Sequence, residues 1–123
     1  CNMHKYQDLK LWNKGIDLVM GVYKATSDFP KEEKYGLISQ MRRSAVSIPS
    51  NIAEGAGRNS NKEFAHFLSI ANGSSYELET QIIVASKLNL LSEEVCNELC
   101  SQLIELQKMN FNLQNHLIEP KSI

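Results

Sequence analysis

The sequence has no long apolar run, and none of its segments approaches the roughly 20 consecutive apolar residues that a membrane-spanning helix requires. The N-terminus lacks the basic stretch and apolar core of a secretory signal. We therefore expect a cytoplasmic protein without membrane association. No segment shows the alternation of apolar and polar residues that is typical of a half-buried strand, which argues against a sheet-based fold.

Cysteine and histidine are scarce, with three of each, and show no zinc-ligand spacing. Cys96 and Cys100 stand one helical turn apart, where helix geometry holds two side chains poorly for a disulfide. We expect reduced, packed thiols and neither a metal nor a cofactor. Met3 suits a native start, which would make Cys1 and Asn2 a processing remnant, so both are left out of the fold prediction.

The net charge of −1 conceals an asymmetry along the chain. Residues 34–62 contain five cations and one acid, a net charge of +4, whereas residues 63–105 contain one cation and seven acids, a net charge of −6. One face of the protein is therefore expected to be basic and another acidic. The alternative is a set of solvated charges on helices that neutralise one another across subunits.

Apolar residues recur at steps of three and four, which predicts amphipathic helices over about residues 7–28, 30–55, 60–88 and 92–118. Connections of a few residues make consecutive helices antiparallel neighbours. The prediction is an all-α, antiparallel, up-down-up-down four-helix bundle, one domain over residues 1–123. The four apolar stripes are Leu9, Trp12, Ile16, Val19 and Tyr23; Leu37, Met41, Ala45, Ile48 and Ile52; Phe64, Leu68, Ala71, Ser75, Leu78, Ile82 and Ala85; and Leu99, Leu103, Leu106, Asn110, Leu113 and Leu117.

Local signals predict where these helices begin and end. Pro30 suits the first turn of the second helix, and Gly55 and Gly57 supply the positive φ of its C-terminus. The other signals are a capping box from Ser60 to Glu63, an N-cap at Ser92 and a stop at Pro120.

Residues 42–58, RRSAVSIPSNIAEGAGR, place a proline inside the second predicted helix. The apolar spacing continues past Pro49, so we expect a helix with a kink, at a cost of about 3 kcal/mol unless other contacts compensate. A polar stripe is expected to face the third helix near residues 71–75, or a neighbouring subunit, and to reach backbone that Pro49 leaves unpaired. Its members are Ser44, Ser47, Asn51, Glu54 and Arg58.

Several motifs together carry a resemblance to a known family. They are YQDL with Trp12, FP with Glu33 and Leu37, RRSAVSIPSNIAEG, and ANGSSYEL. On these motifs the chain resembles the bacterial four-helix-bundle family encoded in 23S rRNA intervening sequences. SIPSNIAEG is the most specific part, and its structural residues are Ser47, Pro49, Asn51, Glu54 and Gly55.

This resemblance implies a four-helix bundle and a ring-shaped homopentamer. It also implies kinship with the accessory proteins of diversity-generating retroelements, which look like basic barrels that bind nucleic acid and a reverse transcriptase. The residues themselves favour a homo-oligomer, because several apolar side chains lie outside the main stripes. These are Val22, Ile38, Ile83, Val95 and Met109. Asn110 is expected to fix helix register or oligomeric state, or to bond with Ser or Gln on a neighbouring helix.

Arg42, Arg43, Arg58 and Lys62 are the candidate nucleic-acid contacts, because clustered cations bind phosphates. No aromatic platform for stacking bases is interleaved with them, and Arg58 can pair with Glu54 one turn away. Any RNA or DNA binding should be weakly sequence-specific, since no base-reading set is present. The alternative is a purely structural or protein-interaction oligomer, a scaffold or accessory factor without nucleic-acid binding.

Catalytic signals are weak. Glu54 and His66 have the residue types of an acid–base pair, but the sequence shows neither a pocket nor a partner arrangement. Gly55 and Gly57 end a helix and follow no strand, contrary to the context of a phosphate-binding loop. We expect a protein that is not an enzyme.

Overall fold

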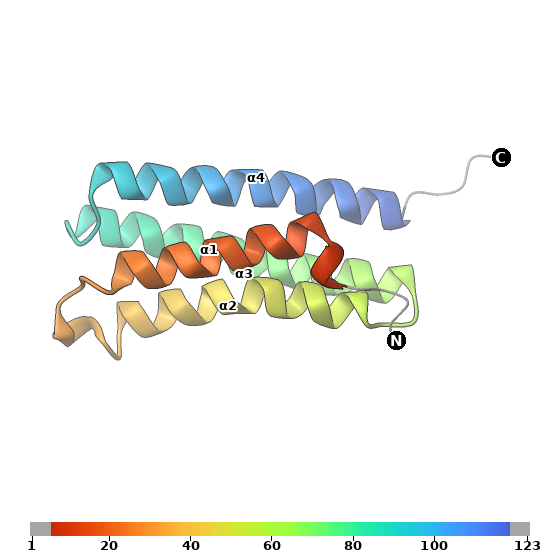
Figure 1. Cartoon of the computed structure of the whole chain (residues 1–123), viewed down its shortest axis with the longest axis horizontal. Helices are drawn as coiled ribbons and strands as arrows, with labels where there is room; N and C mark the ends of the chain where they lie inside the picture. Colours follow the sequence, from red (N-terminus) through yellow and green to blue (C-terminus); the bar gives the residue numbers. More distant parts are fainter. Residues whose placement is uncertain (1–5, 119–123) are drawn as a thin grey trace.

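The computed structural model of the chain describes residues 6–118. Four long helices lie side by side in Figure 1, and the described residues contain no strand. The predictions for Met3, Cys1, Asn2 and Pro120 lie outside this range. The elements in chain order are the short 3-10 turn η1 (Tyr6–Asp8), α1 (Lys10–Thr26), the 3-10 turn η2 (Lys31–Glu33), α2 (Leu37–Ala56), α3 (Asn61–Lys87) and α4 (Glu93–Ile118).

One continuous core runs between the helices. α2 packs against α1 and α3, and α4 packs against α3 and α1. Three of the four predicted apolar stripes lie in this core, with Leu37, Phe64, Leu113 and Leu117 half-buried at their ends. Each fully buried Leu or Ile contributes about 1.5–3 kcal/mol. The largest completely buried apolar side chains are Leu18, Met41, Ile48, Ile52, Leu68, Leu78, Ile82, Leu103, Leu106 and Val22.

The apolar stripe predicted for the first helix is wrong, because α1 is rotated about its axis and buries a neighbouring set of residues. α1 buries Leu11, Gly15, Leu18, Val22 and Thr26, whereas the predicted residues Trp12, Ile16 and Val19 are half-buried and Tyr23 is exposed. The cause is a close contact with α2: a Cβ at Gly15 would lie 3.3 Å from the Cβ of Pro49. Val22, predicted outside the main stripe, is therefore a core residue.

α2 begins later than predicted. Pro30 lies in extended backbone at φ −58° and ψ 149°, and the helix starts only at Leu37. Gly36, at φ −102° and ψ −110°, separates the turn η2 from α2. That conformation lies outside the helical region and interrupts the backbone hydrogen-bond ladder, so the segment from Pro30 to Gly36 forms tight turns instead.

The glycines at the end of α2 have a different role from the predicted one. Gly57 has φ −84° and ψ −2°, so the expected positive φ is wrong. Gly55 is needed for space: a Cβ there would lie 2.7 Å from the Cβ of Phe67 and 3.2 Å from the carbonyl oxygen of Phe64. α2 and α3 can therefore approach this closely only because position 55 has no side chain.

The predicted N-caps of the two following helices are confirmed. The Ser60 hydroxyl accepts a hydrogen bond from the Glu63 amide at 3.1 Å, and the Ser92 hydroxyl accepts one from the Val95 amide at 3.1 Å. Between these helices Asn89 adopts φ 62°, the left-handed conformation that often follows a helix.

α2 continues through Pro49 as one helix, as the apolar spacing predicts. The Ser47 hydroxyl lies 2.9 Å from that of Ser74, which confirms for Ser47 that the polar stripe meets α3 within residues 71–75, whereas Glu54 and Arg58 at the end of the stripe are exposed. The side-chain amide of Asn51 donates to the Ser47 carbonyl at 2.8 Å. It therefore does not bond to the Ala45 carbonyl, which lacks its usual helical donor because Pro49 has no backbone N–H.

Polar side chains also join α3 to α4. Asn110 is 0% exposed, and its Nδ2 donates to the Leu68 carbonyl at 3.0 Å, while Gln114 of the same helix donates to its Oδ1. The partner on the neighbouring helix is thus backbone and not the Ser or Gln side chain expected. Gln107 donates to Ser75 at 3.2 Å. Buried groups of this kind are stable only when paired, so they favour one register of the two helices.

Substitution Gly55→Ala should destabilise the protein. The added methyl group meets Phe67 at its Cβ, which cannot swing away, and such overpacking costs about 1–3 kcal/mol. Gly73→Ala is the matched control, because a Cβ there meets nothing within 4 Å and should stabilise the interior of α3 by up to about 1 kcal/mol. Urea denaturation of the two variants measures both effects. A Gly55→Ala protein as stable as the wild type would contradict the close contact.

Candidate nucleic-acid interface

The four predicted cations divide into two pairs at opposite ends of α2. Arg42 and Arg43 lie in the first turns of α2, whereas Arg58 and Lys62 lie beyond its last residue. At a rise of 1.5 Å per residue, Arg42 and the last residue of α2, Ala56, are about 21 Å apart along the helix axis. A single phosphate group therefore meets one pair and not both.

The pair at the C-terminal end of α2 has acidic neighbours. Arg58 Nη2 lies 2.7 Å from Glu54 Oε2, the pairing expected from the sequence, and its guanidinium lies 4.6 Å from the ring centre of Phe67. An open hollow of about 700 Å³ beside it is lined by two carboxylates, Glu54 and Glu63. These carboxylates weaken the attraction of phosphate to this end of α2, and the assignment of Arg58 and Lys62 as nucleic-acid contacts stays a prediction.

At the other end of α2, Arg42 joins two helices. Its Nε donates to the Thr26 hydroxyl at 2.9 Å, and Nη2 lies 3.4 Å from the Tyr23 carbonyl oxygen. The guanidinium also covers the Tyr23 ring, 4.4 Å from its centre. A cation at the last turn of α1 is favourable because the carbonyl groups there are partly negative. Arg42 is thus held in a fixed orientation, whereas its neighbour Arg43 is exposed.

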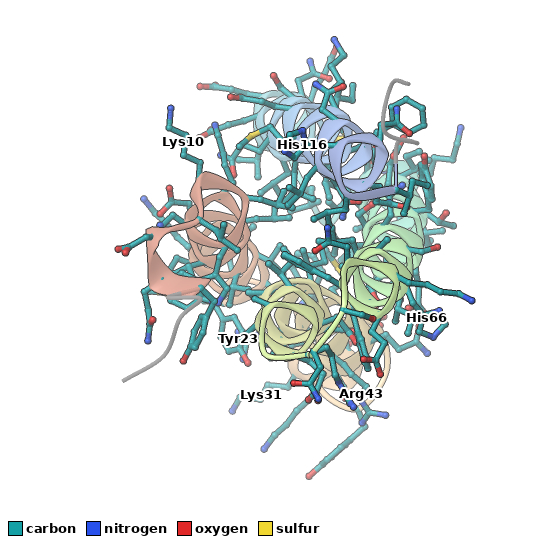
Figure 2. The ribbon with its side chains drawn as sticks, turned by 90° about the vertical axis from the view of Figure 1, so that its right-hand side faces the viewer. Lys10, Tyr23, Lys31, Arg43, His66 and His116 are labelled. Atoms are coloured by element: carbon teal, nitrogen blue, oxygen red, sulfur yellow. The ribbon has the colours of Figure 1, made fainter. Side chains whose placement is uncertain are left out.

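Beside Arg42 lies an open groove of about 540 Å³, here called the corner groove. Three of its lining residues are cations and none is a carboxylate. Its lining residues are Tyr23, Lys34, Tyr35, Ile38, Ser39, Arg42, Arg43 and Val46. In the end-on view of Figure 2, Tyr23 lies on the side where α1 faces α2, and Arg43 lies on the outer side of α2.

The corner groove contains the aromatic residues whose absence the sequence suggested. Tyr35 is 88% exposed, and the ammonium of Lys34 lies 5.5 Å from its ring centre. Tyr23 is 41% exposed and comes from α1. The expectation that no aromatic platform accompanies the cations is therefore wrong at this end of α2. Tyr35 is next to Lys34 in the sequence and could have been found there, whereas Tyr23 precedes Arg42 by 19 positions and comes close only through α1–α2 packing.

The weak catalytic signals find no joint site. Glu54 is paired with Arg58, and His66 lies edge-on to Phe67, with ring centres 5.6 Å apart. Figure 2 shows His66 and His116 on different helices. Between Tyr6 and Ile118, no group of three or more His, Cys, Asp and Glu side chains is placed to hold a metal ion. Among the helices described, none has an apolar stretch long enough to cross a membrane.

Cys96 and Cys100 are free, half-buried thiols packed against the core. Burial, together with smaller effects of the neighbouring Cys96 and Glu79, raises the pKa of Cys100 to about 11. The Cys100 thiol is therefore protonated at neutral pH, and a protonated thiol is a poor nucleophile and a poor metal ligand.

Two comparisons relate the chain to known proteins. The model of the 23S rRNA-intervening sequence protein family matches residues 7–112. Among solved structures, a protein of unknown function from the S23 ribosomal protein family of Bacteroides thetaiotaomicron is similar, with 20% sequence identity and a TM-score of 0.76. The match covers 85% of this chain and 97% of that one, and it shows a shared fold. No curated protein matches the sequence.

The two adjacent arginines of α2 should respond differently to neutralisation. Arg42→Gln loses the charged hydrogen bond to Thr26 and should lower the free energy of unfolding by about 1–2 kcal/mol. Arg43→Gln, at an exposed position, should change it by less than about 0.5 kcal/mol. Thermal and urea denaturation give both values. Equal effects of the two substitutions would rule out a structural role specific to Arg42.

Proposed function

The chain belongs to the 23S rRNA-intervening sequence protein family, and we propose that it is a non-enzymatic, homo-oligomeric four-helix bundle that binds RNA or DNA through its basic surface. The corner groove is the observation that carries this proposal. It brings Lys34, Arg42 and Arg43 together on one open surface without a lining carboxylate. Such a surface attracts phosphate groups through charge alone, which makes binding salt-dependent and largely independent of sequence.

The proposed topology is up-down-up-down. Residue 47 meets residue 74, and residue 55 meets residue 67, so contacts advance along α2 as they retreat along α3. That pairing is typical of antiparallel helices, and short connections elsewhere in the chain favour the same arrangement of the other neighbours.

The proposed assembly is a ring-shaped homopentamer. Outside the corner groove, large apolar side chains are exposed on three helices, among them Met20 on α1, Ile83 on α3 and Phe111 on α4. Their distribution over different faces suits a head-to-tail contact, in which one surface of a subunit meets a different surface of the next. Contacts of this kind close into a ring when the rotation between successive subunits completes a full turn. Attraction between basic residues 34–62 and acidic residues 63–105 would support them.

One observation favours the alternative, a structural or protein-interaction oligomer. The Arg42 guanidinium is hydrogen-bonded to Thr26 and Tyr23 of the same chain, so one of the three groove cations already has a structural role. In this alternative the binding partner is a protein, such as a reverse transcriptase, and not nucleic acid. The two functions differ in whether Lys34 and Arg43 are needed for affinity to a polyanion.

Salt-titrated binding to labelled RNA and DNA tests the proposal. Affinity should fall steeply between 50 and 200 mM salt, as for other phosphate-binding proteins. The double variant Lys34→Gln/Arg43→Gln should bind more weakly and reduce the slope of log K against log salt by about 1.4–1.8, the value for two lost phosphate contacts. Arg58→Gln/Lys62→Gln is the matched control and should change little. Absence of binding at low salt, or unchanged affinity in the first double variant, would favour the alternative.

Light scattering on a sizing column tests the assembly. Five copies of the 13.9 kDa chain have a mass of about 70 kDa. Substitutions Met20→Glu and Phe111→Glu place charges on exposed apolar positions, and each should lower the mass if its face lies between subunits. A 13.9 kDa species at micromolar concentration would exclude the oligomer, and a stable mass other than five copies would exclude the pentamer.

A further inference from the structure

Tyr35 is the most exposed of the large apolar side chains described, with 88% of its surface accessible. It lies in the turn between η2 and α2, so its ring contributes little to the core. Yet it borders the corner groove, next to Lys34 and across from Arg43. An exposed aromatic ring beside cations offers a ligand both a flat apolar face and positive charge.

A second flat surface borders the same groove. The Arg42 guanidinium covers the Tyr23 ring at 4.4 Å from its centre and is held there by two hydrogen bonds. Nucleobases stack on guanidinium planes as well as on aromatic rings. Because Arg42 is already fixed, a base that stacks on it immobilises no further long side chain.

We propose that the corner groove binds single-stranded nucleic acid, with unpaired bases stacked on Tyr35 and on the Arg42–Tyr23 pair while Lys34 and Arg43 contact phosphates. This inference rests on the proposed nucleic-acid binding and names the class of substrate. A duplex buries its base faces within its own stack, so it offers these side chains only phosphates. The open groove, of about 540 Å³, is large enough to admit a nucleobase.

The lining of the groove also indicates tolerance of sequence. The residues between the cations and the tyrosines are Ile38, Ser39 and Val46. Besides Arg, the residue types that read base edges most specifically are Asn, Gln, Asp and Glu, and none of these lies between the cations and the tyrosines. Stacking on flat faces accepts every base, so affinity should depend on strandedness more than on base identity.

Fluorescence anisotropy with a 12-nucleotide single strand and its matched duplex, each as RNA and as DNA, tests the inference. Wild-type protein should bind the single strands at least about tenfold more tightly than the duplexes at equal salt. Tyr35→Ala should weaken single-strand binding by about 5- to 150-fold, the effect of one lost stacked base, and Tyr35→Phe should retain it. Neither substitution should change duplex binding or the salt slope, because the phosphate contacts remain. Tyr76→Ala, at an exposed tyrosine of α3, is the matched control.

The outcomes separate this inference from the function on which it rests. If Tyr35→Ala binds single strands like the wild type while Lys34→Gln/Arg43→Gln binds them weakly, the protein binds nucleic acid but the stacking inference is wrong. Duplex binding as tight as single-strand binding overturns it equally. Loss of mass in light scattering for Tyr35→Ala would assign Tyr35 to a subunit contact and overturn it too. If no nucleic acid binds at low salt, the proposed function fails and this inference fails with it.

Discussion

The close approach of α2 to the helices on either side of it determines how the other elements are arranged. Position 15 of α1 meets Pro49, where a Cβ would make a tight contact at 3.3 Å, and position 55 of α2 meets Phe67, where a Cβ at 2.7 Å would overlap it. The first contact fixes the rotation of α1, which turns Leu18 and Val22 into the core and leaves Tyr23 outside. The external position of Tyr23 is what allows the Arg42 guanidinium to cover its ring. The corner groove is thus a consequence of helix packing.

The same contacts explain why SIPSNIAEG has its particular composition. Ser47 bonds to Ser74, Pro49 packs on Gly15, Asn51 bonds back to Ser47, and Gly55 admits Phe67. Small and polar residues at these positions let three helices approach closely while their buried polar groups remain paired. Ser50 and Glu54 are the exposed residues of the motif, and Glu54 pairs with Arg58. The motif therefore specifies helix packing, and the groove lies at the opposite end of α2.

The sequence predicted the helices that have one clear apolar stripe and failed where two stripes compete. α2, α3 and α4 bury the expected residues, and the caps at Ser60 and Ser92 follow from local chemistry. α1 carries two adjacent apolar stripes of similar length, and periodicity cannot rank them. The contact between Gly15 and Pro49 decides, and it joins positions far apart in the chain. The cations Arg42 and Arg43 could be identified from the sequence. Their grouping with Tyr23 could not, because it too depends on packing between positions far apart in the chain.

Successive residues of a helix point about 100° apart, and the corner groove depends on that angle. Arg42 reaches across to α1, while Arg43 on the next position remains in solvent. A single arginine could not both tie α1 to α2 and follow the phosphates of a mobile ligand, because the first role requires a fixed guanidinium. In the proposed interface, two adjacent arginines divide these roles. The turn from Pro30 to Gly36 then supplies Lys34 and Tyr35 from outside the helices, where neither side chain is needed for the core. Packing thus fixes the Arg42–Tyr23 pair beside the groove, and residues free of packing supply the groups that the proposed function assigns to ligand contact.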